Sequence, residues 1–435
     1  MTGREAAVRG LLAWEKRSAW SDAYLDGLFR REKLPERERA LAKRICCGVI
    51  QNRTALDRFL SPYVRGELQP EVRAILRCAV YQLAFMDRIP PSAAADTAVE
   101  LTKAMANPAA ARVVNAVLRR LTEKPLPSLP EGGDAESLSV RYSHPEWLTK
   151  LWLERLGEED CRRLLAADNE IPPTALRVNR LRCSPEEAAA ALTREGARIR
   201  PLPPLEGFFA LESGNAAELA AFREGLVTVQ DPAAALPVLC AELRPGMRVL
   251  DACAAPGGKS FLLAQETEDR GEILACDLHE KKLSRLEAGA KRLGIGSVRT
   301  QPADARKSPA EWKNAFDLVL ADVPCSGLGV IRKKPEIRWK KREELMALPE
   351  IQLDILRSLA DCVRPGGQLV YSTCTLLEAE NEAVTAAFLA ERRDFTPAAL
   401  LLPQPFGAIQ AGQRTIWPFE YGTDGFYLCR MVREK

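Results

Sequence analysis

Two turns in the second half of the sequence each place a cysteine where it could act as a nucleophile. The first turn reads Asp322-Val-Pro-Cys-Ser-Gly327 and the second reads Ser372-Thr-Cys-Thr375. A thiolate is a strong nucleophile, and a nearby lysine such as Lys259 or the flanking backbone N–H groups can lower its pKa. Because the chain has only two histidines, an imidazole base is scarce. Taken alone, each cysteine is more typical of a small apolar core residue than of a nucleophile.

A third turn, Asp251-Ala-Cys-Ala-Ala-Pro-Gly-Gly-Lys-Ser260, is rich in small residues and leads into a segment of helical pattern. Small residues let the backbone approach a ligand closely, and the N–H groups at a helix start can bind it. The glycine-to-lysine spacing excludes a Walker loop. The turn therefore indicates a nucleotide-like ligand, or else only a tight connection from a strand to a helix.

Carboxylates follow the next three apolar segments, at Asp277, Asp304 and Asp322. Asp277 lies 26 residues after Asp251, near the position where a carboxylate can accept both hydroxyls of a ribose. A single aspartate at the end of a strand is commonly a helix cap. Three in succession favour a ligand that carries ribose and adenine.

The apolar segments that precede these turns predict a parallel sheet. Each is apolar along most of its length, as strands buried on both faces must be, and the intervening stretches have a helical pattern. In such a doubly wound α/β sheet, ligands lie beyond the carboxyl ends of the strands. The predicted strands are Met247–Ala252, Glu272–Cys276, Val298–Ala303, Phe316–Ala321 and Gln368–Ser372.

The residues before this sheet divide into two further segments. Apolar residues recur every three or four positions up to about Thr122, which predicts a helical bundle, and the Pro- and Gly-rich stretch Lys124–Asp134 predicts a linker. Thr174–Asn179 alternates like a strand, and Ser184-Pro-Glu-Glu187 is typical of a helix start, so a small α+β module follows. We therefore predict three domains, at residues 1–140, 141–230 and 231–435.

Composition excludes several classes of protein. The 435 residues are 46% hydrophobic and 28% charged, which is typical of a globular chain and excludes wholesale disorder. The twelve cysteines form no CxxC pair, so we expect neither a disulfide framework nor a metal cluster. The longest charge-free run, Phe395–Gln413, is broken by Pro and Gly and predicts a loop rather than a membrane anchor. Without a secretory apolar start, we expect a cytoplasmic protein.

Charge along the chain is uneven. The net charge is +3, but residues 1–150 contain 24 Lys and Arg against 18 Asp and Glu. This excess permits nucleic-acid binding, although most charges on a helical domain solvate its outer faces. A basic stretch around Trp339 could hold an RNA backbone, or could equally be a solvated helix start. Its members are Arg332, Lys333, Lys334, Arg338, Lys340, Lys341 and Arg342.

Four segments, DACAAPGGKS, CDLHEKK, DVPCSGLG and YSTCTLLEAENE, resemble the Sun/RsmB family of RNA cytosine-C5 methyltransferases, which use S-adenosylmethionine. The resemblance is closest over residues 225–435, and Val113–Arg120 resembles the last helix of a NusB-like RNA-binding domain. It implies a Rossmann-like doubly wound methyltransferase domain, preceded by an all-α NusB-like domain and a small α+β module. This module would bind RNA or serve as a linker between the two domains. The implied partner is 16S ribosomal RNA, and no membrane, metal or obligate protein partner is evident.

The resemblance also implies roles for residues. Cys374 would add to carbon 6 of the cytosine, Cys325 would assist removal of the carbon-5 proton or release of the product, and Asp322 would hold or protonate N3. Lys259 would belong to the same catalytic group. The ribose would bind Asp277 and the adenine would lie near Asp304. The residues expected around the cofactor are Cys253, Ala254, Ala255, Pro256, Gly257, Gly258, Lys259, Asp277, Asp304 and Asp322.

Alternatives stay open at this stage. In DNA cytosine-C5 enzymes the cysteine of the Pro-Cys turn attacks, which makes Cys325 the second candidate nucleophile, although the Thr-Cys motif favours Cys374. The same chemistry could act on transfer RNA or large-subunit RNA, or the chain could be a non-catalytic RNA-binding assembly factor. His144 is expected in a structural turn and His279 at the surface.

Overall fold

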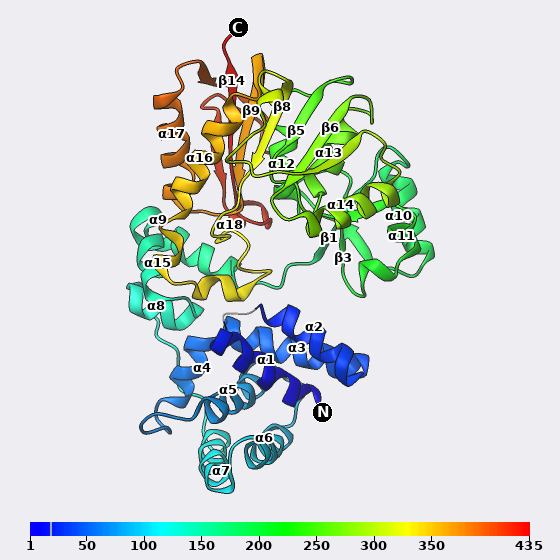
Figure 1. Ribbon diagram of the computed structural model, residues 1–435. Coiled ribbons are helices and arrows are strands. Elements are labelled where there is room, and N and C mark those ends of the chain that lie inside the picture. Colours follow the sequence, from blue (N-terminus) through cyan, green and yellow to red (C-terminus); the bar gives the residue numbers. More distant parts are fainter. Residues whose placement is uncertain (18–19) are drawn as a thin grey trace. The chain divides into compact units, whose positions relative to one another are not determined.

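The structure, a computed structural model, describes residues 1–17 and 20–435. These residues form two compact units, each described here by itself (Figure 1). The first unit contains Met1–Asn169 and Lys334–Lys340, and the second contains Glu170–Lys333 and Lys341–Lys435. A short segment from late in the sequence therefore folds with the first unit. The division into three domains at residues 140 and 230 stays a prediction.

The first unit is helical, as the spacing of its apolar residues predicts. Its helices are α1 (Gly3–Arg17), α2 (Ser21–Glu32), α3 (Glu36–Gln51), α4 (Arg53–Leu60), α5 (Pro70–Phe85), α6 (Pro91–Met105), α7 (Pro108–Thr122), α8 (Ala135–Tyr142), α9 (Glu146–Ala167) and the short 3₁₀ helix η3 (Pro335–Trp339). Leu11, Ile45 and Ile75 bring α1, α3 and α5 into one apolar core. The predicted linker between α7 and α8 has no helix or strand, in agreement with its Pro and Gly content.

The second unit begins with a four-stranded antiparallel sheet in the order β2-β3-β1-β4. Its elements are β1 (Thr174–Val178), α10 (Pro185–Arg194), β2 (Ile199–Pro201), β3 (Phe208–Leu211), η1 (Ala216–Glu218), α11 (Ala220–Arg223) and β4 (Val227–Val229). Ser184 Oγ accepts the N–H of Glu187 at 3.2 Å, and Glu187 Oε2 accepts the N–H of Ser184 at 2.8 Å. This reciprocal cap fixes the start of α10, as predicted for the small α+β module.

The larger sheet has eight strands in the order β10-β14-β9-β8-β5-β6-β7, with β13 also paired to β14. The strands are β5 (Arg248–Asp251), β6 (Glu272–Asp277), β7 (Val298–Pro302), β8 (Phe316–Asp322), β9 (Val363–Thr373), β10 (Phe395–Pro397), β13 (Gln413–Ile416) and β14 (Phe426–Arg433), and the separate two-stranded pair is β11 (Leu400–Leu401) and β12 (Ala408–Ile409). Strands β5 to β9 run parallel to one another, and β14 pairs antiparallel with β9. All five predicted strands are confirmed.

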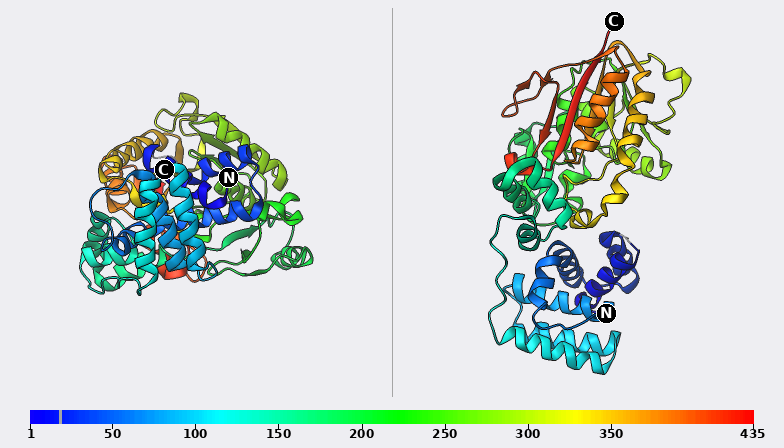
Figure 2. Two further views of the ribbon diagram at one scale, coloured as in Figure 1. Left: turned by 90° about the horizontal axis from the view of Figure 1, so that it is seen from below. Right: turned by 90° about the vertical axis from the view of Figure 1, so that its left-hand side faces the viewer.

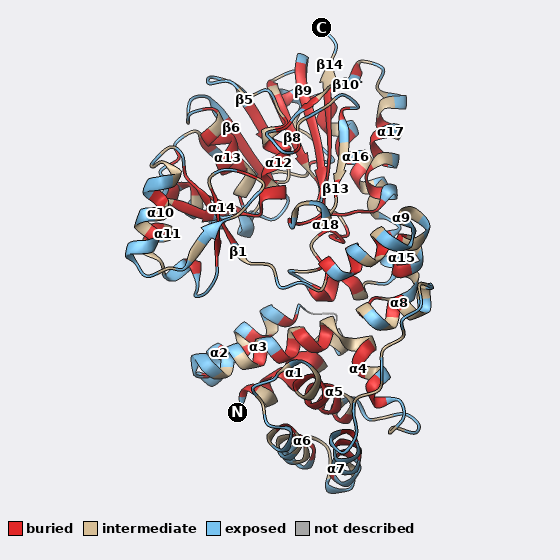
Figure 3. Ribbon diagram, turned by 180° about the vertical axis from the view of Figure 1, so that it is seen from behind, coloured by how far each residue is buried: buried red, intermediate tan, exposed pale blue. Residues whose placement is uncertain are grey.

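Helices cover both faces of this sheet (Figures 2 and 3). On one face lie α12 (Pro232–Leu239), α13 (Gly258–Glu266) and α14 (Glu280–Leu293), and on the other lie α16 (Leu348–Ala360) and α17 (Glu382–Glu391). The remaining short helices of this unit are η2 (Ala310–Trp312), α15 (Arg342–Leu345), η4 (Glu378–Glu380) and α18 (Pro418–Tyr421). Neighbouring residues of β5 enter different cores: Val249 packs with Leu263 of α13, and Leu250 with Ile355 of α16. Because both faces are apolar, the strands read as continuous hydrophobic runs. The predicted doubly wound α/β fold is confirmed.

The region Phe395–Gln413, predicted as a loop, contains the short strands β10, β11 and β12. The loop prediction was therefore incomplete, because short strands at a sheet edge tolerate proline. Pro397, for example, pairs with Met431 at the edge strand β10. Within residues 1–17 and 20–435, no helix has the length and apolar character needed to cross a membrane.

Candidate active site

The two predicted cysteines meet at the carboxyl end of the parallel sheet. The Sγ atoms of Cys325 and Cys374 are 3.3 Å apart. This proximity follows from the register of the sheet, in which Asp322 at the end of β8 lies opposite Ser372 near the end of β9. Because the strands run in parallel, the turns that follow them lie side by side. Both cysteine residues are partly accessible to solvent.

The two cysteine turns are also joined directly. Ser326 Oγ and Thr375 Oγ1, each one residue beyond a cysteine, are 2.6 Å apart. The N–H of Gly329 donates to the carbonyl of Cys374 at 2.9 Å. Since these bonds connect backbone and side chains of both turns, the distance between the thiols is set by the turns and not only by cysteine rotamers.

An ion pair lies beside the thiols. Lys259 Nζ donates to Asp322 Oδ2 at 2.6 Å, and the hydroxyl of Ser372 donates to Asp322 Oδ1 at 2.7 Å. Lys259 belongs to the first turn of α13. Burial alone would lower the pKa of Lys259, but the Asp322 carboxylate next to it raises that pKa above its usual value, so the lysine is held as an ammonium ion.

The two thiols have opposite pKa shifts. With Cys325 as the donor, the hydrogen bond between the sulfur atoms lowers the pKa of Cys374, and the charge of Lys259 lowers it further against the effect of burial. The same hydrogen bond, together with burial, raises the pKa of Cys325 well above its usual value. Cys374 is therefore the thiol that ionises first, which makes it the better nucleophile of the pair.

The predicted cofactor turn connects β5 to α13. Gly257, just before the helix, has a φ of 109°, in the region that L-residues avoid. A Cβ atom at this position would lie 2.5 Å from the ring of Phe261 and 2.8 Å from Leu286. Only glycine fits, so the N–H groups of the first helical turn, which lack intrahelical partners, stay open to a ligand.

The strand-end carboxylates differ in their availability. Asp277 is buried and uses Oδ1 to accept the N–H of His279 at 2.9 Å, which leaves Oδ2 able to accept hydroxyl groups such as those of a ribose. Asp304 instead forms a two-pronged pair with Arg306, with distances of 3.0 and 2.8 Å. The residues present thus fit a nucleoside-bearing cofactor at Asp277, while a contact of Asp304 with adenine would share this carboxylate with Arg306.

Asp251 supports the same turn from below. It is fully buried, and its Oδ2 accepts the hydroxyl of Ser260 at 2.6 Å. Burial raises the pKa of Asp251 to about 7, against the effect of the hydrogen bond from Ser260, and its other carboxylate oxygen has no hydrogen-bond partner. Through Ser260, Asp251 ties the first turn of α13 to the end of β5. Within residues 1–17 and 20–435, no group of three or more His, Cys, Asp or Glu residues is arranged to hold a metal ion.

The basic stretch predicted to hold RNA is largely occupied by contacts within the protein. Arg332 is paired with Asp231 and Asp424 at 3.2 and 3.0 Å, and Lys333 contacts the same two carboxylates at 2.6 and 2.7 Å. These four residues form a charge cluster in which the Arg332 side chain is 4% exposed. The prediction of phosphate contacts is therefore wrong for Arg332.

Arg338 is a second correction. Within the first unit it is fully buried, and its guanidinium donates to the carbonyls of Gln51, Ser143 and Asp168 at 3.1 to 3.2 Å. A guanidinium that satisfies main-chain carbonyls in this way is not free to bind a phosphate. Charge in the sequence indicated RNA binding here, but the residue instead holds η3 to the helices of the first unit.

The predicted roles of the two histidines agree with the structure. His144 is fully buried in the turn between α8 and α9, where Nδ1 donates to the carbonyl of Tyr142 at 2.9 Å. His279 is exposed at the start of α14.

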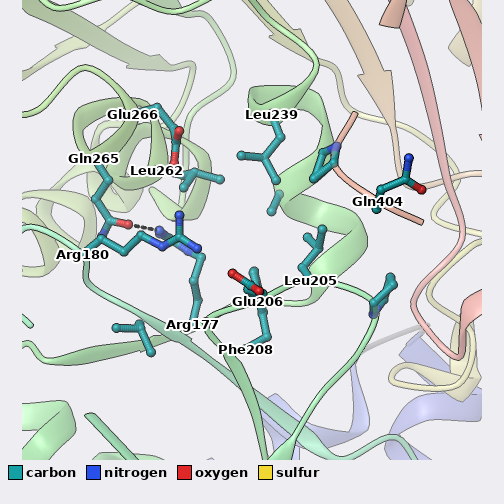
Figure 4. A pocket seen from close by; sticks show the side chains of 15 residues that line it. Arg177, Arg180, Leu205, Glu206, Phe208, Leu239, Leu262, Gln265, Glu266 and Gln404 are labelled. Carbon is teal, nitrogen blue, oxygen red and sulfur yellow. Dashed lines mark hydrogen bonds between the residues drawn. The ribbon is translucent and has the colours of Figure 1, made fainter. Parts of the chain in front are cut away.

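A separate cleft of about 400 Å³ lies between the antiparallel sheet and helices α12 and α13 (Figure 4). None of the predicted site residues lines it. Its wall contains Arg177 of β1, which donates to Gln265 and, at 3.4 Å, to the carbonyl of Gly258. Burial lowers the pKa of Arg177 to about 9. Arg177 therefore connects the small α+β module to the cofactor turn. No motif in the sequence marks it as a site residue.

Comparison with known families gives three matches in order along the chain. Residues 1–123 match the NusB family, residues 144–217 match the ferredoxin-like domain of RsmF/B-like methyltransferases, and residues 238–432 match the family described as 16S rRNA methyltransferase RsmB/F. The predicted order of an all-α NusB-like region, a small α+β module and a Rossmann-like methyltransferase fold is thereby confirmed.

Similar proteins extend over the whole chain. A probable ribosomal RNA small subunit methyltransferase B of Bacillus subtilis is 36% identical over 99% of this chain and 98% of its own length. One solved crystal structure is 27% identical, with a TM-score of 0.81 over 100% of this chain and 98% of its own. A methyltransferase homolog protein from Pyrococcus horikoshii is 26% identical, with a TM-score of 0.59 over 69% of this chain and 98% of its own.

Proposed function

Because the chain belongs to the RsmB/F family of 16S rRNA methyltransferases, we propose that it methylates carbon 5 of a cytosine in small-subunit ribosomal RNA through a covalent cysteine adduct. The observation that carries this proposal is the 3.3 Å distance between the Sγ atoms of Cys325 and Cys374 beside the Lys259–Asp322 pair. Packing alone requires none of these four side chains, and a non-catalytic assembly factor would need none of them.

The first step follows from the chemistry of cytosine. Carbon 5 is a poor nucleophile until another group adds to carbon 6 and delivers electron density to its neighbour. Cys374 supplies that group, because its lowered pKa provides thiolate and the thiolate attacks carbon 6. The new S–C6 bond turns carbon 5 into the nucleophile that receives the methyl group.

Asp322 orients the ring and Lys259 stabilises the negative charge that develops on it. Asp322 already accepts hydrogen bonds from Lys259 and Ser372, so it acts as an acceptor that holds the amino group next to N3. Lys259 contributes a fixed positive charge next to the thiolate and the ring. Such preorganised charges lower the barrier because they need no rearrangement during the reaction.

Cys325 acts in the second half of the cycle. After methyl transfer, carbon 5 carries both the methyl group and its original hydrogen, which leaves as a proton. The C6–S bond then breaks, and its electron pair returns to Cys374 as thiolate. The carbon-5 proton passes to solvent water, which accounts for the one proton that the overall reaction releases. Cys325, which is protonated and hydrogen-bonded to the sulfur of Cys374, stabilises the departing thiolate and so assists release of the product. The enzyme ends the cycle in its starting state.

The cofactor site fits S-adenosylmethionine, which would supply the methyl group as an electrophile when bound. The turn from Cys253 to Lys259 would contact it, Asp277 would accept its ribose hydroxyls through the free Oδ2, and Asp322 would face its reactive end. We also keep Asp304 as a candidate near the adenine. The RNA itself is the partner, and the NusB-like region would contribute to holding it.

A covalent-trapping experiment tests the proposal. The variant Cys325→Ala is incubated with S-adenosylmethionine and an unmethylated 16S rRNA transcript, and the products are separated on a denaturing gel. We expect a slowly migrating protein–RNA adduct, absent from the double variant Cys325→Ala/Cys374→Ala. Cys240→Ala, which removes a buried cysteine of the same unit, serves as the matched control and should turn over normally. Absence of an adduct from Cys325→Ala would contradict the proposal.

The nature of the product needs a second measurement. Bisulfite sequencing of 16S rRNA from cells that lack the gene should reveal a cytosine that has lost its protection. Protection lost instead in transfer RNA or in large-subunit RNA would retain the chemistry and change the substrate.

A further inference from the structure

Two side chains outside the proposed catalytic group, Glu380 and Gln352, hold the turn that carries Cys325. Glu380, in the short helix η4 after the Thr-Cys turn, accepts the N–H of Ser326 through Oε2 at 2.9 Å. Gln352 of α16 donates from Nε2 to the carbonyl of Pro324 at 3.0 Å. The peptide groups before and after Cys325 are thus each held by a hydrogen bond from outside the turn.

The two clamping side chains also bind each other. Gln352 Nε2 donates to Glu380 Oε2 at 2.8 Å. Glu380 is further fixed by its own carbonyl, which accepts the hydroxyl of Tyr371 at 2.6 Å. Side chains locked by several bonds in this way hold their partners in one geometry. The residues around Cys325 therefore form a connected network and not a chance contact.

Burial shows that this network is costly to build. Glu380 is 1% exposed and Gln352 is fully buried. None of the salt bridges between described residues includes Glu380, and its Oε1 has no hydrogen-bond partner. Burying a carboxylate without a cation costs free energy. The hydrogen bonds from Ser326 and Gln352 offset part of that cost, and they tie the carboxylate to the turn that carries Cys325.

The clamp bonds directly to the turn of one cysteine. Both of its bonds go to residues next to Cys325, whereas the carbonyl of Cys374 accepts the N–H of Gly329. The hydrogen bond to Cys374 and burial raise the pKa of Cys325, and the charge of Glu380 adds to that rise. Glu380 therefore favours the protonated form of Cys325, which is the form that donates to the sulfur of Cys374.

We propose that Glu380, together with Gln352, is a positioning residue for Cys325 that governs breakdown of the covalent RNA adduct and not its formation. This inference rests on the proposed function, because it assigns the second thiol to the release step. When the clamp is removed, Cys325 loses its position against the departing sulfur while Cys374, Lys259 and Asp322 keep theirs.

Adduct formation and turnover are measured separately to test this. The variants Glu380→Ala and Glu380→Gln are mixed with excess 16S rRNA transcript and radiolabelled S-adenosylmethionine, and both the adduct on a denaturing gel and the methylated RNA are followed in time. For Glu380→Ala we expect adduct formation within about 2-fold of the unaltered enzyme, and turnover slowed roughly 10- to 100-fold, as a misplaced catalytic group produces. Glu380→Gln keeps an acceptor oxygen and should recover part of the turnover.

Two controls separate positioning from general damage. Glu378→Ala changes an exposed carboxylate two residues earlier in η4 and should behave as the unaltered enzyme. In the background of Cys325→Ala, adding Glu380→Ala should cause no further accumulation of adduct, because Glu380 acts through Cys325. Thermal unfolding and binding of S-adenosylmethionine report whether each variant is folded.

Every outcome bears on the proposal. Equal loss of adduct formation and turnover in Glu380→Ala would make Glu380 a merely structural residue and overturn the inference. An adduct in Cys325→Ala but none in Glu380→Ala would overturn the clamp alone and leave the proposed function intact. No adduct in Cys325→Ala would overturn the proposed function, and the role of the clamp would fall with it.

Discussion

Cysteines lie close to one another in two regions of this protein. One group is in the helical core of the first unit, and the other is at the carboxyl end of the parallel sheet in the second unit. Cys46 and Cys47 are neighbours on α3, and Cys78 faces the same core from α5. Burial raises the pKa of Cys47 to about 12 and raises that of Cys78 further. Cys374 alone departs in the opposite direction.

The difference between the two groups is one of partners and not of proximity. Among the described side chains that determine its pKa, Cys374 has a thiol donor in Cys325 and a cation in Lys259, which together outweigh burial. For Cys47, burial and the carboxylates of Asp22 and Glu336 outweigh the charge of Lys43 and the hydrogen bond with Ser21, so its pKa rises. A cysteine thus becomes a nucleophile when its surroundings stabilise the thiolate, which neighbouring cysteines in a core do not do.

The largest test of this comparison is Cys374→Ala. It removes the nucleophile, and we expect methyl transfer to 16S rRNA to fall by roughly four orders of magnitude or more, as the loss of a nucleophile does in other covalent enzymes. Transfer of radiolabel from S-adenosylmethionine measures the effect. Cys47→Ala is the matched control and should stay within about 2-fold. Turnover retained by Cys374→Ala would place the nucleophile at Cys325.

Lys259→Met tests whether the positive charge of Lys259 is one of the features that distinguish Cys374 from the core cysteines. The variant removes the positive charge beside Cys374, so we expect a loss of about 100-fold in methyl transfer, the size seen when one charge-stabilising group is removed. The pH at which iodoacetamide alkylates Cys374 half-maximally should rise, because Lys259 lowers the pKa of this thiol. Lys259→Arg keeps the charge and should shift that midpoint less. An unchanged midpoint in Lys259→Met would remove the lysine from thiolate stabilisation.

The positions of these partners could be predicted from the sequence only where a local rule applies. Asp322, Cys325 and Cys374 follow apolar strands, and the rule that parallel strands present their carboxyl ends at one edge brings them together. The short distance between the thiols follows from the pairing of β8 with β9, which no local pattern shows. Lys259 could be predicted as a site residue because it belongs to the glycine-rich turn Asp251–Ser260.

Residues that act across long stretches of sequence were not predictable. Glu380 is 54 residues from Ser326, and Gln352 is 28 residues from Pro324, so only the folded chain brings them into contact. The prediction of an RNA contact for Arg338 was wrong, because basic residues interleaved with Trp339 favour phosphate contacts locally, whereas this residue packs within the first unit. Tertiary contacts therefore override the local pattern at the residues that position the site.

A smaller effect tests the other side of the comparison. Cys78→Ser places a hydroxyl where burial disfavours polar groups, so we expect the free energy of unfolding to fall by about 1 to 3 kcal/mol, with methyl transfer at permissive temperature unchanged. Urea unfolding followed by circular dichroism measures the first quantity. Loss of methyl transfer in a variant that remains folded would show that the core cysteines serve the reaction, and the contrast between the two regions would fail.

The last prediction concerns the pH dependence of stability at Asp251. Like the core cysteines, this carboxylic acid has a pKa that burial raises. Burial raises the pKa of Asp251 to about 7 in the folded protein, above the value of about 4 for an unfolded aspartate. Between these two values the folded state retains a proton that the unfolded state has lost. Stability from this group is therefore complete below about pH 4, declines as pH rises and is lost above about pH 7, by at most about 1.4 kcal/mol per pH unit.

Asp251→Asn should remove that slope, because the amide stays neutral at every pH. The free energy of unfolding from urea titrations at pH 5, 6, 7 and 8 would show the unaltered protein losing stability relative to the variant up to pH 7, and running parallel to it beyond. Parallel curves over the whole range would mean that Asp251 is already ionised at pH 5. The hydrogen bond from Ser260 and the charge of Lys259, which both lower the pKa of Asp251, would then outweigh burial, as Cys325 and Lys259 do for Cys374. Asp251 would in that case belong with the reactive thiol and not with the cysteines of the core.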